Sequence, residues 1–352
     1  MTVSVLICDD SGFARKAMAR SLPDGWDIDI SFAEHGQQAI DMIKQGKGDI
    51  LFLDLNMPVL DGYQTMQIIR SEDLPTLVIV VSGDVQEEAR NRMLALGAVD
   101  FIRKPIDNEK LSTILAKYGI YTGETSAQKR EQTNLLSENA GEAEKLDAFR
   151  ELANVAMGQA GENLAKILNE FIDLPIPNVS LLHSSELHMA LDEVNRNKQM
   201  SAVSKGFIST GISGEAIILF NDSNVQSMAS LLGDDISNDD ISNDDISNND
   251  GSGEIEVLMD VSNILIGACL NALSEQLNVK FTHNTPIILG LHCDLEKLMN
   301  NQVSRWEKVL AIEIAYAISK HDISFELLLL IPDQDVDKVF NRLVFQKGSE
   351  HE

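Results

Sequence analysis

The sequence predicts a doubly wound α/β domain with a five-stranded parallel sheet over residues 1–121, followed by an α+β domain over residues 144–346. Five short apolar runs alternate with five helical patterns in the first domain, as in parallel sheets covered on both faces. Residues 122–143 are polar and poor in large apolar side chains, which predicts a linker. One pattern of the second domain returns after 109 residues, from Asn154 to Asn263, which predicts an internal duplication with pseudo-two-fold symmetry.

The elements of the first domain follow from these patterns in chain order. Strands are expected at the apolar runs VSVLICDD, DIDISFAE, GDILFLDLN, TLVIVVSG and VDFIRKP. Helices are expected at GFARKAMARSL, HGQQAIDMIKQ, DGYQTMQIIRS, QEEARNRMLALG and DNEKLSTILAKYG. Short runs that are apolar throughout are typical of strands buried on both faces, and each crossover between parallel strands carries a helix.

The second domain opens with an amphipathic helix near residue 144, then a strand near IDLPIPNVSLL and a short helix at SSELHMALDEV. A hairpin is expected at AVSKGFISTGISGEAIILF, and a helix at SNVQSMASLLG. Residues 234–253 contain a repeat of the unit ISNDD and no aromatic residue, which predicts a disordered acidic insertion. The helix pattern then restarts, and VLAIEIAYAISKHDISFELLLLIPDQDVDKVFNRL again predicts strand, turn, strand and helix. The repeated positions are Asn154, Gly158 and Pro177 in the first copy and Asn263, Gly267 and Pro286 in the second.

The charge of the chain narrows the classes of partner. Asp and Glu number 55 against 28 Lys and Arg, for a net charge of −27, so binding to nucleic acid or to anionic membrane is not expected. The three cysteines share no metal or redox spacing, and the acidic start MTVSVLICDD lacks the core of a signal peptide. We therefore expect a cytoplasmic protein, and its oligomeric state is open.

Polar residues able to bind a metal or a phosphoryl group stand at the predicted ends of the strands. Asp9 and Asp10 follow the first strand, Asp54 the third, Ser82 the fourth, and Lys104 the fifth. Because ligands of open α/β sheets bind beyond the carboxyl ends of the strands, these side chains are expected to converge. Clustered carboxylates favour Mg²⁺, and one of them can accept a phosphoryl group whose oxygens the metal and the lysine neutralise. For any one Asp alone a helix cap or loop role is the better reading, but five such residues at successive strand ends favour a site.

Residues 1–121 resemble the receiver domain of two-component response regulators, a flavodoxin-like fold. The motifs CDD, DLNMP with the following DG, VSG and RKP occur in order at the expected strand ends. The resemblance implies that a histidine kinase phosphorylates Asp54, and that Lys104 precedes a cis proline bond. It further implies roles for Asp9, Asp10, Asp54 and the backbone carbonyl of Asn56 as Mg²⁺ ligands, and for Ser82, Phe101 and Lys104 as phosphate-binding and switch residues.

Glu151 and Asn154 are the candidate site of the second domain. Residues three apart lie on one helix face, with Asp147 one turn earlier. The acid can pair with a cation, and the carboxamide offers both a donor and an acceptor to one water molecule. A solvent-facing helix surface is the alternative reading, but the return of the pattern in the second copy favours a function.

This pattern resembles that of the CheC/CheX/FliY phosphatases of bacterial chemotaxis, which remove phosphoryl groups from receiver domains. Their signature has Asp or Ser, then Glu, Asn and a distant Pro. This chain provides Asp147, Glu151, Asn154 and Pro177, with 22 residues between the last two. The second copy provides Glu256, Asp260, Asn263 and Pro286 at the same spacing. Asp260 is one methylene shorter than Glu, so its carboxylate is withdrawn by about 1 Å, a displacement that can cost about a hundredfold in rate.

The resemblance implies a receiver-regulated aspartyl-phosphate phosphatase in chemotaxis-type signalling, with Glu151 and Asn154 as its catalytic residues and Asp260 and Asn263 as a second candidate site. Its expected substrate is a phosphorylated CheY-like response regulator. The linker is long enough, at roughly 25 Å by random-coil scaling, for Asp54 of the same chain to be the substrate instead. A separate receiver is favoured on sequence alone. The rival function is a non-catalytic adaptor that binds chemotaxis proteins when Asp54 is phosphorylated, whereas a DNA-binding regulator has the wrong charge.

Overall fold

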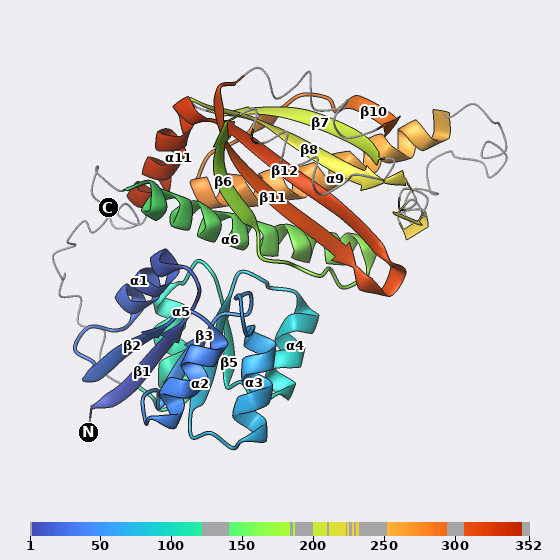
Figure 1. The fold of residues 1–352 in the computed structure, drawn as a ribbon. Coiled ribbons are helices and arrows are strands. Elements are labelled where there is room, and N and C mark those ends of the chain that lie inside the picture. Colours follow the sequence, from blue (N-terminus) through green and yellow to red (C-terminus); the bar gives the residue numbers. More distant parts are fainter. Residues whose placement is uncertain are drawn as a thin grey trace. The chain divides into compact units, whose positions relative to one another are not determined.

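The computed structural model of this chain describes residues 2–121, 141–183, 200–209, 211–222, 252–293 and 306–346, with a few single positions between them. Its contacts divide the chain into two compact units, Met1–Gly158 and Gln159–Glu352 (Figure 1). The predicted linker and acidic insertion lie almost entirely outside the described residues, as does most of the short helix expected at SSELHMALDEV.

The first unit contains the predicted five-stranded parallel sheet. Its strands are β1 (Val3–Cys8), β2 (Ile28–Ala33), β3 (Ile50–Leu53), β4 (Leu77–Ser82) and β5 (Asp100–Arg103). They lie in the order β2-β1-β3-β4-β5, and all four pairings are parallel. The helices that join or follow them are α1 (Gly12–Ser21), α2 (Gly36–Lys44), α3 (Gly62–Ser71), α4 (Glu87–Ala95) and α5 (Asn108–Lys117). The prediction of a doubly wound α/β domain is therefore confirmed.

The helices cover both faces of this sheet because its strands carry apolar side chains on both. Helices α1 and α5 supply Met18 and Leu111 to a buried cluster that includes Phe52 of β3. Helices α2 and α3 lie on the opposite face (Figure 1). The first residue of α3 is Gly62, where a Cβ would come within 2.4 Å of the carbonyl oxygen of Asp54. This glycine lets α3 begin directly against the end of β3.

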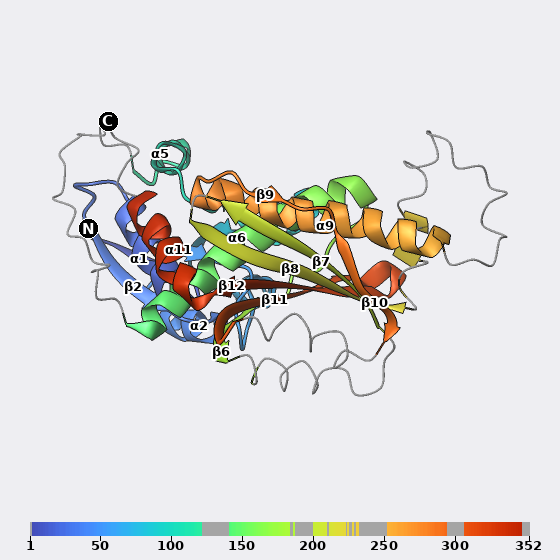
Figure 2. The same ribbon diagram turned by 90° about the horizontal axis from the view of Figure 1, so that it is seen from above.

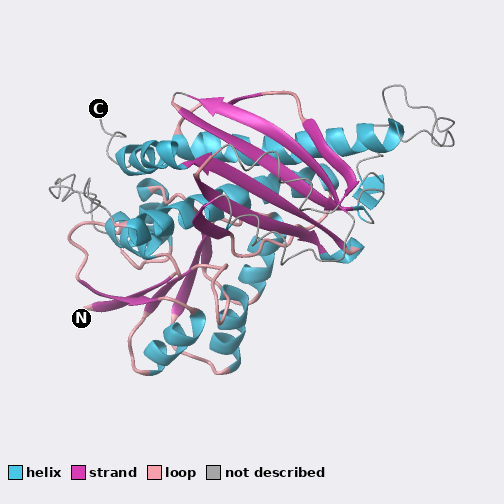
Figure 3. Ribbon diagram, turned by 45° about the horizontal axis from the view of Figure 1, so that its top comes forward, coloured by secondary structure: helices cyan, strands magenta, loops and turns pink. Residues whose placement is uncertain are grey.

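The second unit is built on one antiparallel sheet (Figure 3). Its strands are β6 (Asn178–His183), β7 (Met200–Ser209), β8 (Ile212–Asn221), β9 (Thr282–His283), β10 (Ile287–Cys293), β11 (Lys308–Ile318) and β12 (Ile323–Pro332). The order is β10-β7-β8-β12-β11-β6, with β9 paired to β7. The predicted hairpin is β7 with β8. The α+β class is confirmed, and α11 (Asp333–Gln346) packs against the sheet.

The first sequence copy contributes β6, β7 and β8, and the second contributes β10, β11 and β12. Exchanging equivalent strands of the two copies reverses the strand order without changing it. Strand β6 of the first copy pairs with β11 of the second, and β10 of the second pairs with β7 of the first. Each half of the sheet therefore consists of the hairpin of one copy and a single strand of the other copy. This interlocking is the pseudo-two-fold arrangement that the duplication predicts.

Two long helices carry the repeated pattern. Helix α6 covers Glu142–Leu168 and helix α9 covers Ser252–Leu277 (Figure 2). Both end in an asparagine with left-handed backbone, Asn169 at φ 49° and Asn278 at φ 47°, a conformation that asparagine tolerates better than most residues. The division between the two units falls within α6, after Gly158, so its first part belongs to the unit that contains the parallel sheet. None of the described helices is long and apolar enough to cross a membrane.

Candidate active site

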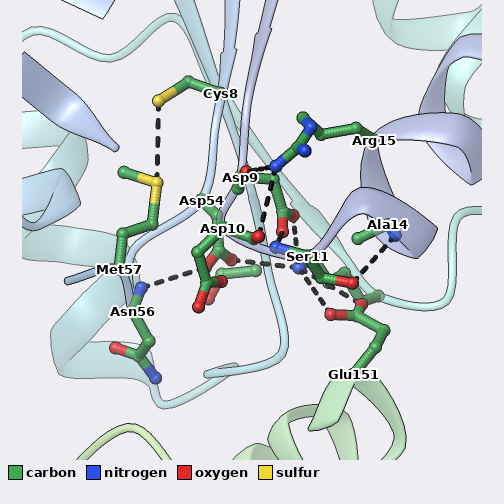
Figure 4. A network of polar contacts seen from close by, with 12 residues as sticks. Cys8, Asp9, Asp10, Ser11, Ala14, Arg15, Asp54, Asn56, Met57 and Glu151 are labelled. Atoms are coloured by element: carbon green, nitrogen blue, oxygen red, sulfur yellow. Dashed lines mark hydrogen bonds and ion pairs between the residues drawn. The ribbon is translucent and has the colours of Figure 1, made fainter. Parts of the chain in front are cut away.

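Three carboxylates meet at the carboxyl edge of the parallel sheet. Asp9 and Asp10 follow β1, Asp54 follows β3, and one oxygen from each lies within 4.8 Å of the others (Figure 4). Asp9 is buried, and one of its oxygens accepts a hydrogen bond from the backbone N–H of Ser11 at 2.9 Å. The sequence prediction that the strand ends converge is confirmed for these three residues, whose clustering suits a divalent cation.

Among the described residues, Lys104 places a positive charge against these carboxylates. Its ammonium lies 2.7 Å from Asp9 and 3.2 Å from Asp54. Burial alone would lower the pKa of Lys104, but Asp54, Asp9 and Glu151 together raise the pKa well above its ordinary value. The lysine therefore stays protonated. The peptide bond to Pro105 is cis, as the resemblance to receivers implies.

Asp54 is the most buried member of the cluster, with an exposure of 1%. One oxygen accepts from the backbone N–H of Asn56 at 3.1 Å, and the other forms the ion pair with Lys104. Burial raises the pKa of Asp54, and burial together with Asp9 raises the pKa of Asp10 to about 6. The pocket thus carries more negative charge than its lysine balances, which is the condition that a bound cation relieves.

The remaining predicted receiver residues border this edge. Ser82 is buried at the end of β4, and its hydroxyl accepts from the backbone N–H of Asp84 at 3.1 Å. The backbone N–H of Lys104 donates to the carbonyl oxygen of Ser82 at 2.9 Å, which holds the ends of β4 and β5 together. Phe101 lies in β5 and is half-buried.

Glu151 of α6 also reaches this pocket. Its two carboxylate oxygens lie 3.2 and 3.4 Å from the ammonium of Lys104, within the same compact unit (Figure 4). Only 12% of the Glu151 side chain is exposed. The sequence predicts that Glu151 pairs with a lysine of a substrate receiver, and the lysine that it contacts here belongs to this chain.

Two further acids of α6 contact the start of α1. A carboxylate oxygen of Asp147 accepts from the backbone N–H of Phe13 at 2.7 Å, which satisfies a donor that the helix itself leaves unpaired. Glu144 lies 3.5 Å from Lys16 in a more exposed ion pair. Asp147, predicted as the first residue of the motif, therefore supplies an acceptor to the first turn of a receiver helix whose own N-cap is Ser11.

A pair of glycines lets the backbone of α6 approach the loop after β4. A Cβ on Gly158 would come within 1.9 Å of the carbonyl oxygen of Gly83, and a Cβ on Gly83 within 2.9 Å of the carbonyl oxygen of Asn154. Sequence reasoning identified Gly158 only as a repeated position and did not assign a contact to either glycine. A glycine within an otherwise favourable helix is the signal that points to close packing.

Asn154 is buried beside this glycine contact, with an exposure of 5%. Its carboxamide oxygen has no hydrogen-bond partner among the described residues. A buried acceptor without a partner costs about 1–3 kcal/mol, so this oxygen is free to accept a hydrogen bond from a bound group or a water molecule.

The second copy of the motif lies in the other unit and differs in its surroundings. Asp260 and Asn263 of α9 are exposed. The carboxamide oxygen of Asn263 accepts from the ammonium of Lys205 at 2.6 Å, and Lys205 itself is 3% exposed. A Cβ on Gly267 would meet no atom within 4 Å among the described residues. The side chain of Glu256 lies outside the described part of the chain.

Comparison with known proteins supports the receiver assignment directly. Residues 5–116 match the response regulator receiver domain family. They form a receiver domain. The chain is 37% identical over 139 residues to the probable C4-dicarboxylate response regulator DctR of Bacillus subtilis, covering 40% of this chain and 55% of DctR. It is also 37% identical over 115 residues to protein-glutamate methylesterase/protein-glutamine glutaminase 3 of Geobacter sulfurreducens, covering 32% and 31% of the two chains. This chain therefore spans between about a third and about half of the length of these relatives.

Solved structures resemble both parts of the fold. The response regulator domain of Thermotoga maritima CheB is 29% identical, with a TM-score of 0.30, and covers 34% of this chain and 100% of that chain. Thermotoga maritima FliY covers 57% of this chain and 96% of that chain, at 20% identity and a TM-score of 0.42. The FliY match corresponds to the C-terminal region that follows the receiver domain.

Proposed function

We propose that this chain is a signalling phosphatase that hydrolyses the aspartyl phosphate of a receiver domain. The observation that carries the proposal is the position of α6 at a receiver pocket. Glu151 contacts Lys104 at 3.2 Å, and the neighbouring Asn154 holds a buried carboxamide oxygen that has no hydrogen-bond partner among the described residues. A fixed carboxamide beside an acyl phosphate is suited to holding water for attack on phosphorus.

The receiver residues suit formation of that acyl phosphate. A histidine kinase is the phosphodonor that a receiver domain implies, and Asp54 is the acceptor at the centre of the pocket. The carboxylates of Asp9, Asp10 and Asp54 and the backbone carbonyl of Asn56 would hold Mg²⁺. The donor set fits, because three clustered carboxylates face one lysine and hard oxygen ligands suit this ion. When bound, the cation neutralises charge on the phosphoryl oxygens.

Hydrolysis then requires orientation rather than a new nucleophile from the protein. The carboxamide of Asn154 orients a water molecule so that its oxygen forms a bond to phosphorus. The bond between phosphorus and the Asp54 carboxylate oxygen breaks, and its electron pair returns to the carboxylate. The water's two protons leave with the phosphate, which exchanges them with solvent. Lys104 balances charge on the phosphoryl oxygens, as positively charged groups do in other phosphoryl transfers.

Glu151 acts in this scheme as a positioning residue. Its carboxylate lies against the ammonium of Lys104, so it fixes α6 relative to the group that faces the phosphate. Holding the reacting groups in place supplies a large part of the rate in such reactions, and a displacement of about 1 Å can cost about a hundredfold.

The test follows the loss of labelled phosphate from the receiver in the full-length chain. Asn154→Ala is expected to slow the loss by about a hundredfold because the water is no longer held. Asn163→Ala is the matched control, since Asn163 is an exposed asparagine of the same helix, and it should leave the rate unchanged. Equal rates for wild type and Asn154→Ala would refute catalysis by this residue.

A second function, a phosphorylation-dependent adaptor, is favoured by one observation. Glu151 shares Lys104 with Asp9 and Asp54, so a phosphoryl group on Asp54 competes with Glu151 for the same ammonium. Phosphorylation would then release α6 and expose it to another signalling protein. The adaptor requires Glu151 but no held water, so under this function Asn154→Ala retains the full phosphate lifetime and the full response.

A further inference from the structure

We propose that the substrate of Glu151 and Asn154 is Asp54 of the same chain, so that this protein limits the lifetime of its own phosphorylated state. The inference rests on the proposed phosphatase function and names its substrate. It goes against the sequence-based preference for a separate receiver. The contacts that support it are all internal to the compact unit Met1–Gly158.

Four positions of α6 contact the receiver at separate points along one face of the helix. Asp147 accepts from the first turn of α1, Glu151 pairs with Lys104, and Asn154 and Gly158 meet Gly83. The positions 147, 151, 154 and 158 are spaced by four, three and four residues, which places them on one face. They extend over about 16 Å at a rise of about 1.5 Å per residue, enough to cross the mouth of the pocket.

The chemistry of these contacts matches the receiver's working end rather than its general surface. Phe13 lies just after Asp9 and Asp10, Gly83 follows Ser82, and Lys104 is the cation of the pocket. A helix that packed only for stability would not need to place an acid on this lysine, because a third carboxylate beside a buried ammonium adds desolvation cost. The arrangement places Asn154 beside the residues that hold the phosphoryl group.

The same contacts disfavour an outside receiver as the substrate of this site. Glu151 is 12% exposed and Asn154 is 5% exposed, so neither presents a surface to a second protein in this arrangement. An outside receiver must first displace the attached one. Covalent attachment gives an intramolecular partner an effective concentration in the millimolar range for short linkers, which an outside receiver rarely matches.

The first experiment separates reaction within a chain from reaction between chains. Full-length Asn154→Ala chain is labelled on Asp54 with a small acyl-phosphate donor, freed of donor, and mixed with unlabelled Asp54→Asn chain, which retains Asn154 but accepts no label. We expect slow loss of label at every concentration of the added chain, and fast loss from wild type at a rate independent of dilution.

Each other outcome has a defined meaning. If added Asp54→Asn chain restores the wild-type rate, the site acts between chains, and the inference fails while the phosphatase function stands. If Asn154→Ala loses its label as fast as wild type, the phosphatase function itself fails.

The second experiment breaks the docking without altering Glu151, Asn154 or any residue of the pocket. Gly158→Ala adds a methyl group 1.9 Å from the carbonyl oxygen of Gly83, which must push α6 away. Alanine is favoured over glycine within a helix, so the helix itself is preserved. Gly267→Ala is the matched control at the equivalent position of α9, where the space is open.

The expected result is slower loss of the chain's own label, by about tenfold or more, for Gly158→Ala and no change for Gly267→Ala, because a displaced helix no longer orients the water. Circular dichroism verifies that both variants are folded. If Gly158→Ala matches Gly267→Ala, the docked arrangement is not the productive one. If Gly158→Ala instead speeds loss of label from other chains while its own is unchanged, the docking blocks the site, and the inference is overturned.

Discussion

Helices α6 and α9 carry the same residue pattern and differ in what faces it. On α6 the acid contacts Lys104 of the receiver, and the backbone at Asn154 and Gly158 lies against Gly83. On α9 Asp260 and Asn263 are exposed, and the space beside Gly267 is open in the described part of the chain. The same pattern therefore meets different surroundings on the two helices: on α6 it faces the receiver pocket, and on α9 the described residues leave its acid and amide exposed.

The comparison also suggests why two copies coexist. The duplicated domain needs both copies to build its sheet, since β6 of the first copy pairs with β11 of the second and β10 of the second pairs with β7 of the first. Both helices are therefore retained for the fold, whether or not both are used in chemistry. Asp260 is exposed on α9, so the shorter acid meets no close packing among the described residues.

The largest expected effect comes from making α6 resemble α9. Glu151→Asp shortens the side chain by one methylene and withdraws its carboxylate from Lys104 by about 1 Å, so loss of the receiver's own phosphate should slow by up to about a hundredfold. Asp260→Glu, the reverse change on α9, should leave that rate unchanged, because Asp260 is exposed in the other unit. Label decay in the full-length chain measures both. A comparable slowing by both variants would mean that the two helices act on one substrate.

Removal of the acceptor that Asp147 supplies to α1 should have a moderate effect. Asp147→Ala leaves the N–H of Phe13 without its acceptor, which costs about 1 kcal/mol of docking energy by analogy with lost helix caps and slows phosphate loss by up to about fivefold. Glu144→Gln removes only the exposed pair with Lys16 at 3.5 Å and should change the rate by less than about twofold. If the two variants behave alike, the Asp147 contact does not contribute to docking.

Much of the receiver could be predicted because its signals are local. Apolar runs fix the strands, and the topology of parallel sheets brings their ends to one edge, so Asp9, Asp54 and Lys104 converge without knowledge of any contact. The duplication is equally visible in the sequence, since Asn154, Gly158 and Pro177 recur after 109 residues as Asn263, Gly267 and Pro286.

The docking of α6 on its own receiver was not predictable in the same way. Gly83 reads as a turn residue, and Gly158 reads as a weak position within a helix. Their close approach depends on the folded arrangement of α6 against the loop after β4. The sequence likewise predicts that Glu151 pairs with a lysine but does not predict which one, because Lys104 and a lysine of a partner have the same chemistry.

A smaller effect is expected on the stability of α9. Gly267→Ala fills open space within a helix, so it should raise the free energy of unfolding by about 0.8–1.0 kcal/mol and the melting temperature of the second unit by about 2–4 °C. Thermal unfolding of the full-length chain, followed by circular dichroism, measures the shift. Gly158→Ala should show no such gain, because its methyl group collides with Gly83. A gain at both positions would show that the close approach on α6 is easily relieved.

The smallest effect is a pH-dependent change in stability caused by Lys205, whose ammonium donates to the carboxamide of Asn263 on α9. Burial lowers the pKa of Lys205 below its ordinary value of 10.5, although its ammonium donates to Asn263 at 2.6 Å. The unfolded chain then binds this proton more tightly than the folded chain, so stability increases as pH rises from the lowered pKa toward 10.5. The free energy of unfolding of wild type relative to Lys205→Met should therefore increase between about pH 7 and about pH 10.

Urea unfolding of both proteins at the two pH values measures that difference, and subtracting Lys205→Met removes the titration of all other groups. A difference that falls with pH would mean that the bond to Asn263 outweighs burial and holds the lysine charged. Asn263 would then hold a charged lysine as Glu151 holds Lys104, and its carboxamide would not be available to a second receiver. A difference that rises with pH shows that burial outweighs the bond to Asn263 and favours the uncharged lysine in the folded chain.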